Sequence, residues 1–147
     1  MDIIRIMVVE DHQIVREGLG RMLELEPDMR VVAEASNADE AISQARVVDP
    51  DVIIMDIQMP GMDGIELTRR LTEDRPELKI LILTLYEDYL PEAIAAGAVG
   101  YLRKDLGRWE LVQAIRTASG QRFMLTTEGD GLLDVPRAHS NPEVSSE

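Results

Sequence analysis

The chain has 147 residues, of which 45% are hydrophobic, and this is enough for one globular domain with a single core. Its net charge of -13 at pH 7 works against binding to nucleic acid or to an anionic membrane surface. The lack of cysteine excludes a disulfide framework and a thiolate metal site, and the N-terminal run MDIIRIMVVED is too short for a signal peptide or a membrane span. We therefore expect a cytoplasmic protein.

Short runs rich in β-branched residues alternate with stretches of helical spacing between residues 3 and 119. This alternation is typical of a parallel sheet covered by helices. The third and fourth runs are almost entirely apolar, as strands buried on both faces are. The predicted strands are Ile3 to Val9, Arg30 to Ala35, Val52 to Asp56, Lys79 to Thr84 and Val99 to Arg103.

Apolar residues between these runs recur at spacings of three or four, which predicts amphipathic helices. The clearest sets are Val15, Leu19, Met22 and Leu23; Ala38, Ala41, Ile42 and Ala45; and Leu111, Ala114, Ile115 and Ala118. Asn37 and Asp39 are placed to cap the second helix, and Pro91 suits the first turn of the fourth. Gly97 suits the end of that fourth helix. Five strand-and-helix units result.

The last part of the chain, residues 120–147, differs in composition. It has no sustained period, is dense in Gly, Pro, Ser and Asn, and carries two basic against five acidic residues. Such a segment is expected to be partly disordered. We therefore divide the chain into a domain of residues 1–120 and an acidic tail or linker of residues 121–147, without a recognisable DNA-binding domain.

Polar side chains stand where four of the predicted strands end. In an open parallel α/β sheet, ligands bind outside the carboxyl ends of the strands, so these side chains are expected to converge on one small crevice. They are Glu10 and Asp11 after the first strand, Asp56 at the third, Thr84 at the fourth and Lys104 after the fifth.

This combination predicts phosphoryl-transfer chemistry. Crowded carboxylates resist ionisation unless a cation neutralises them, and Mg²⁺ is the hard, oxygen-liganded ion that suits them. Asp56 is then the best nucleophile, because it ends a central apolar strand and is followed by a loop able to bend around a metal. Thr84 and Lys104 can donate to phosphoryl oxygens, so metal, positioning groups and donors are all present.

The same residues carry a family resemblance. Glu10-Asp11, MDIQMPGMDG around Asp56, ILTLYED at Thr84 and GAVGYLRKD ending beyond Lys104 resemble the receiver domain of two-component response regulators, over about residues 3 to 119. DHQIVREGL and AGAVGYLRKD are most similar to the NarL/LuxR-type branch, whose members usually carry a C-terminal helix-turn-helix. The resemblance implies a doubly wound, flavodoxin-like (CheY-like) (βα)5 fold with a five-stranded parallel sheet in the order 2-1-3-4-5.

The resemblance also implies a role for each matching residue. Asp56 would accept a phosphoryl group from a histidine kinase or phosphotransfer protein, as part of a phosphorelay. Asp11 and Asp56 would hold Mg²⁺, with Glu10 acting through water and the backbone carbonyl of Gln58 completing the site. Lys104 would pair with the phosphoryl group.

Two residues would form the switch. Thr84 would move toward the phosphate, and Tyr101 would swing inward behind it, although an aromatic residue near a strand end is commonly part of the core. The change would control homodimerisation or a downstream output, with transcription regulation the expected role. The chain would catalyse only its own phosphorylation and dephosphorylation, so it is not expected to be an enzyme with a separate substrate.

Two other functions stay open on the sequence. A haloacid-dehalogenase-like phosphatase also uses Asp, Thr or Ser, Lys and Mg²⁺, but it carries a second Asp two residues after the nucleophile, where this chain has Gln58. An interaction module that works without phosphate is the other alternative, because bulky Leu85 follows Thr84 where many receiver domains have a small residue. His12 is expected to be an exposed residue of the first helical turn rather than a metal ligand.

Overall fold

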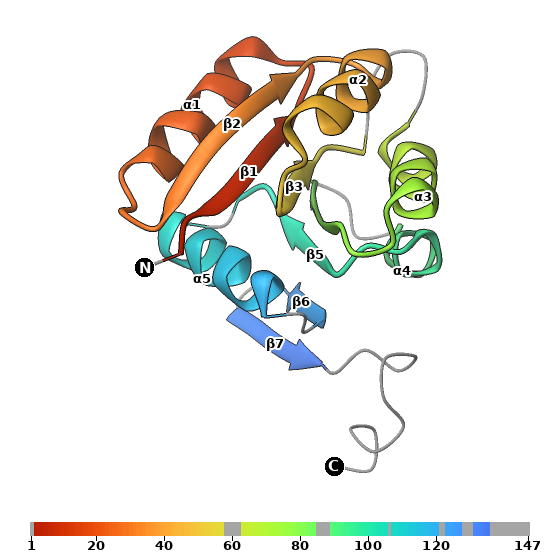
Figure 1. The fold of residues 1–147 in the computed structure, drawn as a ribbon. Helices are drawn as coiled ribbons and strands as arrows, with labels where there is room; N and C mark the ends of the chain where they lie inside the picture. The colour runs from red at the N-terminus through yellow and green to blue at the C-terminus, as the bar shows by residue number, and fades with distance from the viewer. Residues whose placement is uncertain are drawn as a thin grey trace.

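A computed structural model of the protein describes residues 2–57, 63–84, 89–105 and 107–120, together with the backbone of residues 123–127 and 131–135. The strands in this part of the chain form one sheet in the order β2-β1-β3-β4-β5-β6-β7 (Figure 1). Their bounds are β1 Ile4–Val9, β2 Met29–Ala35, β3 Val52–Met55, β4 Lys79–Thr84, β5 Gly100–Arg103, β6 Phe123–Thr127 and β7 Gly131–Val135. The first five strands are parallel and in the predicted order, so the predicted fold class is confirmed.

The three helices with a predicted apolar spacing, the first, second and fifth in the chain, lie where that spacing places them, and the fourth helix is the shortest of those described. Their bounds are α1 Gln13–Glu24, α2 Ala38–Val48, α3 Gly64–Asp74, α4 Leu90–Ala96 and α5 Arg108–Ser119. Of the two candidate caps of α2, Asn37 is the cap, because its side chain accepts a hydrogen bond from the Glu40 N–H, whereas Asp39 lies in the first turn. Pro91 is in the first turn of α4, and Gly97 ends that helix in the left-handed conformation, at φ 107°.

The core consists of two apolar layers, one on each face of the sheet. One layer packs β3 residue Met55 with Leu67 of α3, and it extends under α2 and α4. The other packs Ile54 with Ile115 of α5, and it extends under α1. Ile54 and Met55 are adjacent in β3 and face opposite sides, which is why this strand has no polar residue. The central strands are therefore packed between helices on both faces of the sheet, and this packing holds their carboxyl ends in place.

The C-terminal tail contains the main difference from the sequence-based fold. The predicted sheet had five strands, whereas β6 adds parallel to β5 through the pairs Gly100 with Met124 and Tyr101 with Leu125, and β7 adds antiparallel to β6. The prediction missed these strands because FMLTT and GLLDV are short and are separated by a polar, glycine-containing stretch. The open backbone edge of β5 supplies the pairing partner that local sequence does not reveal. The flexibility predicted for residues 121–147 stays a prediction.

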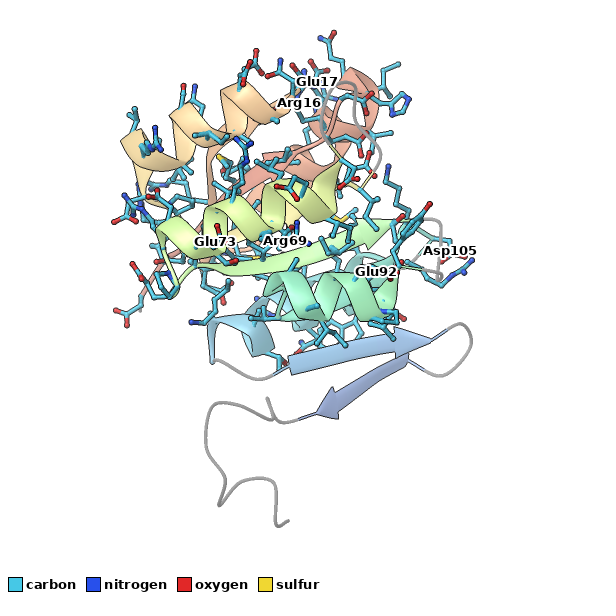
Figure 2. All side chains as sticks on the ribbon, turned by 90° about the vertical axis from the view of Figure 1, so that its right-hand side faces the viewer. Arg16, Glu17, Arg69, Glu73, Glu92 and Asp105 are labelled. Atoms are coloured by element: carbon cyan, nitrogen blue, oxygen red, sulfur yellow. The ribbon has the colours of Figure 1, made fainter. Side chains whose placement is uncertain are left out.

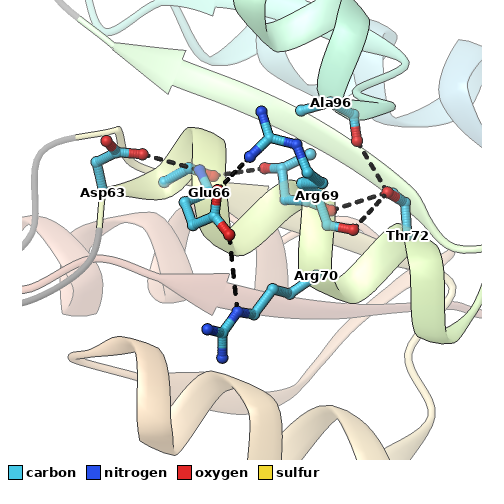
Figure 3. A network of polar contacts seen from close by, with 8 residues as sticks. Asp63, Glu66, Arg69, Arg70, Thr72 and Ala96 are labelled. Carbon is cyan, nitrogen blue, oxygen red and sulfur yellow. Dashed lines mark hydrogen bonds and ion pairs between the residues drawn. The ribbon is translucent and has the colours of Figure 1, made fainter.

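Helices α3 and α4 are tied together by a polar contact at their ends (Figure 3). The Thr72 hydroxyl lies 2.8 Å from the Ala96 carbonyl oxygen, the last residue of α4, and 2.9 Å from the Thr68 carbonyl oxygen of its own helix. A Cβ at Gly97 would come within 2.8 Å of the Thr72 hydroxyl. The C-terminal end of α4, which leads into β5, is thus held at a fixed place against α3.

At its other end, α3 begins with a capped and charge-paired turn. The Asp63 side chain accepts a hydrogen bond from the Glu66 N–H, and the Glu66 carboxylate pairs with both Arg69 and Arg70 (Figure 3). Figure 2 shows Arg69 and Glu73 on this helix and Glu92 on α4, while Arg16 and Glu17 mark α1.

None of the helices among the described residues is both long and apolar enough to cross a lipid bilayer.

An ion-pair network joins α5 to the turn between α1 and β2. Arg116 donates to both carboxylate oxygens of Asp28, each at 2.8 Å, and to Glu26 at 2.9 Å. Arg108 donates to the other Glu26 oxygen at 2.6 Å. Hydrogen bonds from Arg116 lower the pKa of Asp28, and hydrogen bonds from Arg108 and Arg116 lower the pKa of Glu26.

We predict that Arg116→Ala destabilises the fold at neutral pH and that the difference from the native chain shrinks in acid. The folded-state pKa values are lowered, so the stability that they contribute is present above the unfolded values of 4.5 for Glu26 and 3.8 for Asp28, and it is lost as pH falls through the folded ones. Urea unfolding at pH 7 and at about pH 3 would measure the difference. The control is Arg46→Ala, whose 65% exposed side chain pairs with Asp74 at 3.8 Å. An equal loss at both pH values would contradict the prediction.

Candidate functional site

The predicted site residues lie together at the carboxyl end of the sheet. Glu10 follows β1, Asp56 follows β3, Thr84 ends β4 and Lys104 follows β5. Backbone hydrogen bonds continue the strand pairing beyond the strands, from Asp56 N–H to Val9 at 3.0 Å and from Lys104 N–H to Thr84 at 2.7 Å. Figure 2 shows this end of the sheet on the side where Asp105 lies, next to Lys104 in the chain. The sheet therefore fixes the backbone of every one of these residues.

Carboxylates gather at this end in a way that fits a hard cation. Ligand atoms of Glu10, Asp11, His12 and Asp56 all lie within 4.8 Å of one another. Glu10 and Asp56 are buried, with exposures of 1% and 6%. One Asp11 oxygen, Oδ1, is buried without a hydrogen-bond partner, and its 3.3 Å contact with His12 Nδ1 is an ion pair only when the imidazole is protonated. An unsatisfied oxygen among carboxylates is the donor set that Mg²⁺ prefers.

Lys104 is the cation that the chain itself supplies to this cluster. Its Nζ lies 2.8 Å from Glu10 Oε1 and 3.5 Å from Asp56 Oδ1, and its side chain is 17% exposed. Burial opposes the charged form of Lys104, but its hydrogen bond to Glu10 and the charge of Asp56 outweigh burial and raise its pKa. Burial likewise opposes ionisation of Glu10, yet hydrogen bonds from Lys104 and His12 lower its pKa. Lys104 and Glu10 are thus both charged at neutral pH, with Glu10 the nearer partner of the lysine.

Both predicted switch residues are buried. Thr84 is 1% exposed and is paired with Arg103 across β4 and β5. Tyr101 is 2% exposed and belongs to the apolar layer under α2, α3 and α4. The core position that the sequence allowed for Tyr101 is therefore its position here, and the switch roles of both residues stay predictions.

Two residues named from the sequence lie outside the described residues. Gln58, whose backbone carbonyl was predicted to complete the metal site, falls within residues 58–62. Leu85, on which the phosphate-independent alternative depends, falls within residues 85–88. The metal-ligand role of Gln58 and the effect of Leu85 therefore stay predictions.

His12 is exposed, as predicted, but it also contacts the site. It precedes α1 as the N-cap residue, and its side chain makes no capping hydrogen bond. Its backbone N–H and its Nδ1 lie 3.1 Å and 2.9 Å from Glu10 Oε2. The hydrogen bond to Glu10 and the charge of Asp11 raise the pKa of His12. Its place directly after Glu10-Asp11 was the sequence signal for this contact.

Gly64 is a site residue that the sequence analysis missed. It begins α3, and its N–H donates to the Ile57 carbonyl at 2.6 Å. A Cβ at this position would overlap the Asp56 carbonyl oxygen and come within 2.8 Å of the Ile57 Cα. Only glycine lets the first turn of α3 pack directly against the backbone of the central carboxylate.

We predict that Gly64→Ala destabilises the protein by about 1–3 kcal/mol, because the new methyl group must displace the backbone at Asp56. The matched control is Gly18→Ala in α1, where an added Cβ meets nothing within 4 Å. That change should stabilise the protein by about 0.5–1 kcal/mol, since alanine favours the helix. Urea unfolding of both variants measures the two effects. Equal tolerance of alanine at the two positions would show that the contact at Asp56 is not tight.

Comparison with known proteins identifies the family. The family model for the response regulator receiver domain matches residues 6–116. The response regulator GacA of Pseudomonas viridiflava is 41% identical over 124 residues, which are 82% of this chain and 58% of GacA. The transcriptional regulatory protein LiaR of Bacillus subtilis is 42% identical over 118 residues, which are 79% of this chain and 56% of LiaR. The chain therefore spans little more than half the length of these two relatives.

A solved structure covers the chain almost completely. The crystal structure of a LuxR-family two-component response regulator from Aurantimonas sp. SI85-9A1 superposes with a TM-score of 0.82 at 37% identity, over 99% of this chain and 100% of that one. Sequence family, relatives and fold agree with one another and with the strand-end residues described above. The chain belongs to the receiver domain family of two-component response regulators.

Proposed function

We propose that this chain is a phosphorylation-controlled switch in which Asp56 accepts a phosphoryl group from a histidine kinase or phosphotransfer protein. The observation that carries the proposal is the meeting of Asp56 with Glu10, Asp11 and Lys104 at the carboxyl end of the sheet. The chain would catalyse its own phosphorylation and dephosphorylation and turn over no separate substrate.

The carboxylates of the site would have two roles, binding of Mg²⁺ and nucleophilic attack on phosphorus. Glu10, Asp11 and Asp56 would hold Mg²⁺, with the Gln58 carbonyl as the further ligand expected from the family. The bound ion would neutralise the carboxylates and the incoming phosphoryl oxygens. A carboxylate oxygen of Asp56 forms the new O–P bond while the P–N bond to the donor histidine breaks, and the donor imidazole keeps that electron pair.

The donors would then stabilise the product. The Lys104 ammonium, already 3.5 Å from Asp56, can pair with one phosphoryl oxygen. The Thr84 hydroxyl at the end of β4 can donate to another. Because Thr84 and Tyr101 lie on paired strands β4 and β5, a shift at Thr84 can be followed by Tyr101. The phosphorylated state would be favoured only by such contacts, which the unphosphorylated state lacks.

The output of the switch would be homodimerisation or control of a partner in transcription. LiaR is a transcriptional regulatory protein by name, and this chain covers 56% of its length. The acidic chain itself is not proposed to bind nucleic acid or membrane, since its net charge is -13. Partnership with a histidine kinase would place the protein in the cytoplasm.

We expect intact mass spectrometry to show the gain of one phosphoryl group after incubation with Mg²⁺ and acetyl phosphate. The gain should disappear in Asp56→Asn, which keeps the shape of the side chain but removes the nucleophilic carboxylate. It should also disappear with EDTA, because the crowded carboxylates then lack their cation. The matched control is Asp105→Asn, which removes a 60% exposed carboxylate at the same end of the sheet. This control should be phosphorylated like the native chain.

Other outcomes would point elsewhere. No gain of mass in the native chain would favour an interaction module that works without phosphate. Equal phosphorylation of Asp56→Asn would move the acceptor to another residue. Steady release of phosphate from a phosphate monoester would favour a phosphatase.

A further inference from the structure

The two carboxylate oxygens of Glu10 are held by different residues. Oε1 lies 2.8 Å from Lys104 Nζ, and Oε2 accepts from the His12 backbone N–H at 3.1 Å and contacts His12 Nδ1 at 2.9 Å. Glu10 is 1% exposed, so these contacts replace the water that the carboxylate would have in solution. The lysine of the site is thus engaged by Glu10 more closely than by Asp56.

This arrangement creates a problem for the proposed chemistry. Lys104 has to weaken its contact with Glu10 when it pairs with a phosphoryl group on Asp56. A buried carboxylate that loses its partner cation is strongly destabilised unless other donors remain. Mg²⁺ would supply positive charge to the carboxylate cluster, and His12 supplies hydrogen bonds to Glu10 Oε2. The release of Lys104 therefore depends on how firmly these partners hold Glu10.

We propose that His12 is a positioning residue that holds Glu10 Oε2, so that Lys104 can leave Oε1 for the phosphoryl group on Asp56. The inference rests on the proposed function of Asp56 as the acceptor. A neutral imidazole with its hydrogen on Nδ1 already donates this hydrogen bond, so the role does not require a charged His12.

The surroundings of His12 separate this role from a structural one. The ring is 70% exposed, and its side chain caps no N–H group of α1. Within the described part of the chain, its polar contacts are those with Glu10 and Asp11. The backbone carbonyl of Glu10 is held separately, by Arg16 Nη1 at 2.8 Å. Removal of the ring should therefore leave both α1 and the backbone of Glu10 in place.

The first test is the affinity for beryllofluoride, a phosphoryl mimic, in saturating Mg²⁺, followed by amide NMR shifts. His12→Ala should weaken binding by about three- to tenfold, the effect of losing one ordinary hydrogen bond from a side chain that is 70% exposed. His12→Phe keeps the bulk of the ring without its donor and should weaken binding to the same extent. The matched control Gln13→Ala removes an exposed neighbour whose side chain donates a hydrogen bond to Glu17, and it should bind like the native chain.

The second test is the rate of Asp56 phosphorylation in a cycle of four proteins: native, His12→Ala, Lys104→Ala and the double variant. His12→Ala should slow the native chain by about three- to tenfold. In the Lys104→Ala background the same change should alter the rate by less than about twofold, because no lysine then has to be released. Long incubations make slow rates measurable by intact mass.

The outcomes of these tests separate the positioning role of His12 from the proposed function of Asp56. Equal loss from His12→Ala with and without Lys104, or no loss in His12→Ala and His12→Phe, would overturn the positioning role. Failure of the native chain to bind beryllofluoride or to gain phosphate would instead overturn the proposed function. Urea unfolding of each variant verifies that the compared proteins are folded.

Discussion

The charge balance of the site depends on the ion pair between Glu10 and Lys104. These residues follow β1 and β5, which are not neighbours, since β3 and β4 lie between them in the sheet. The long lysine side chain crosses the ends of the two central strands and brings one positive charge to a cluster of buried carboxylates. Without that charge, the carboxyl end of an otherwise apolar sheet would hold like charges at short range in a poorly solvated place. The pair thus makes the site compatible with a stable fold and sets the contact that chemistry at Asp56 must change.

The sequence was sufficient to predict the buried strands and the polar residues at their carboxyl ends, but not the contacts that these side chains make. Val52-Ile53-Ile54-Met55 and the run from Ile80 to Leu83 have no polar residue, which identifies strands buried on both faces, and the polar residue that ends each run then marks the site. Side-chain reach is not encoded so locally, because the choice of Lys104 between Glu10 and Asp56 depends on distances across the sheet from β5 to β1 and to β3. Gly64 was missed for a similar reason, since its necessity lies in the backbone of Asp56 packed against it. Strands β6 and β7 depend on an edge that exists only after β5 has folded.

Polar contacts restrain the helices on both faces of the sheet. Thr72 ties the last residue of α4 to α3, while the first turn of α4 comes soon after Thr84 in the chain. A displacement that begins at Thr84 would therefore reach α4 at its beginning, with its end held in place, and would tilt the helix rather than translate it. The opposite face has a different restraint, because Arg116 and Arg108 fasten α5 to the turn before β2. These contacts restrain how a change at the carboxyl end of the sheet could be transmitted to the helices.

Because β6 is attached to β5 by few residue pairs, different parts of the sheet are expected to open at different free energies. β6 meets β5 at two residue pairs, whereas β1 pairs with β2 at six positions and with β3 at four. Opening free energies follow the extent of such pairing and packing, so the hairpin of β6 and β7 can separate while the five central strands stay closed. Its backbone amides would then exchange with solvent hydrogen well before those of β1 and β3. The strand that carries Tyr101 would alternate between an interior and an edge position on a timescale set by the two residue pairs between β5 and β6, independently of the unfolding of the domain.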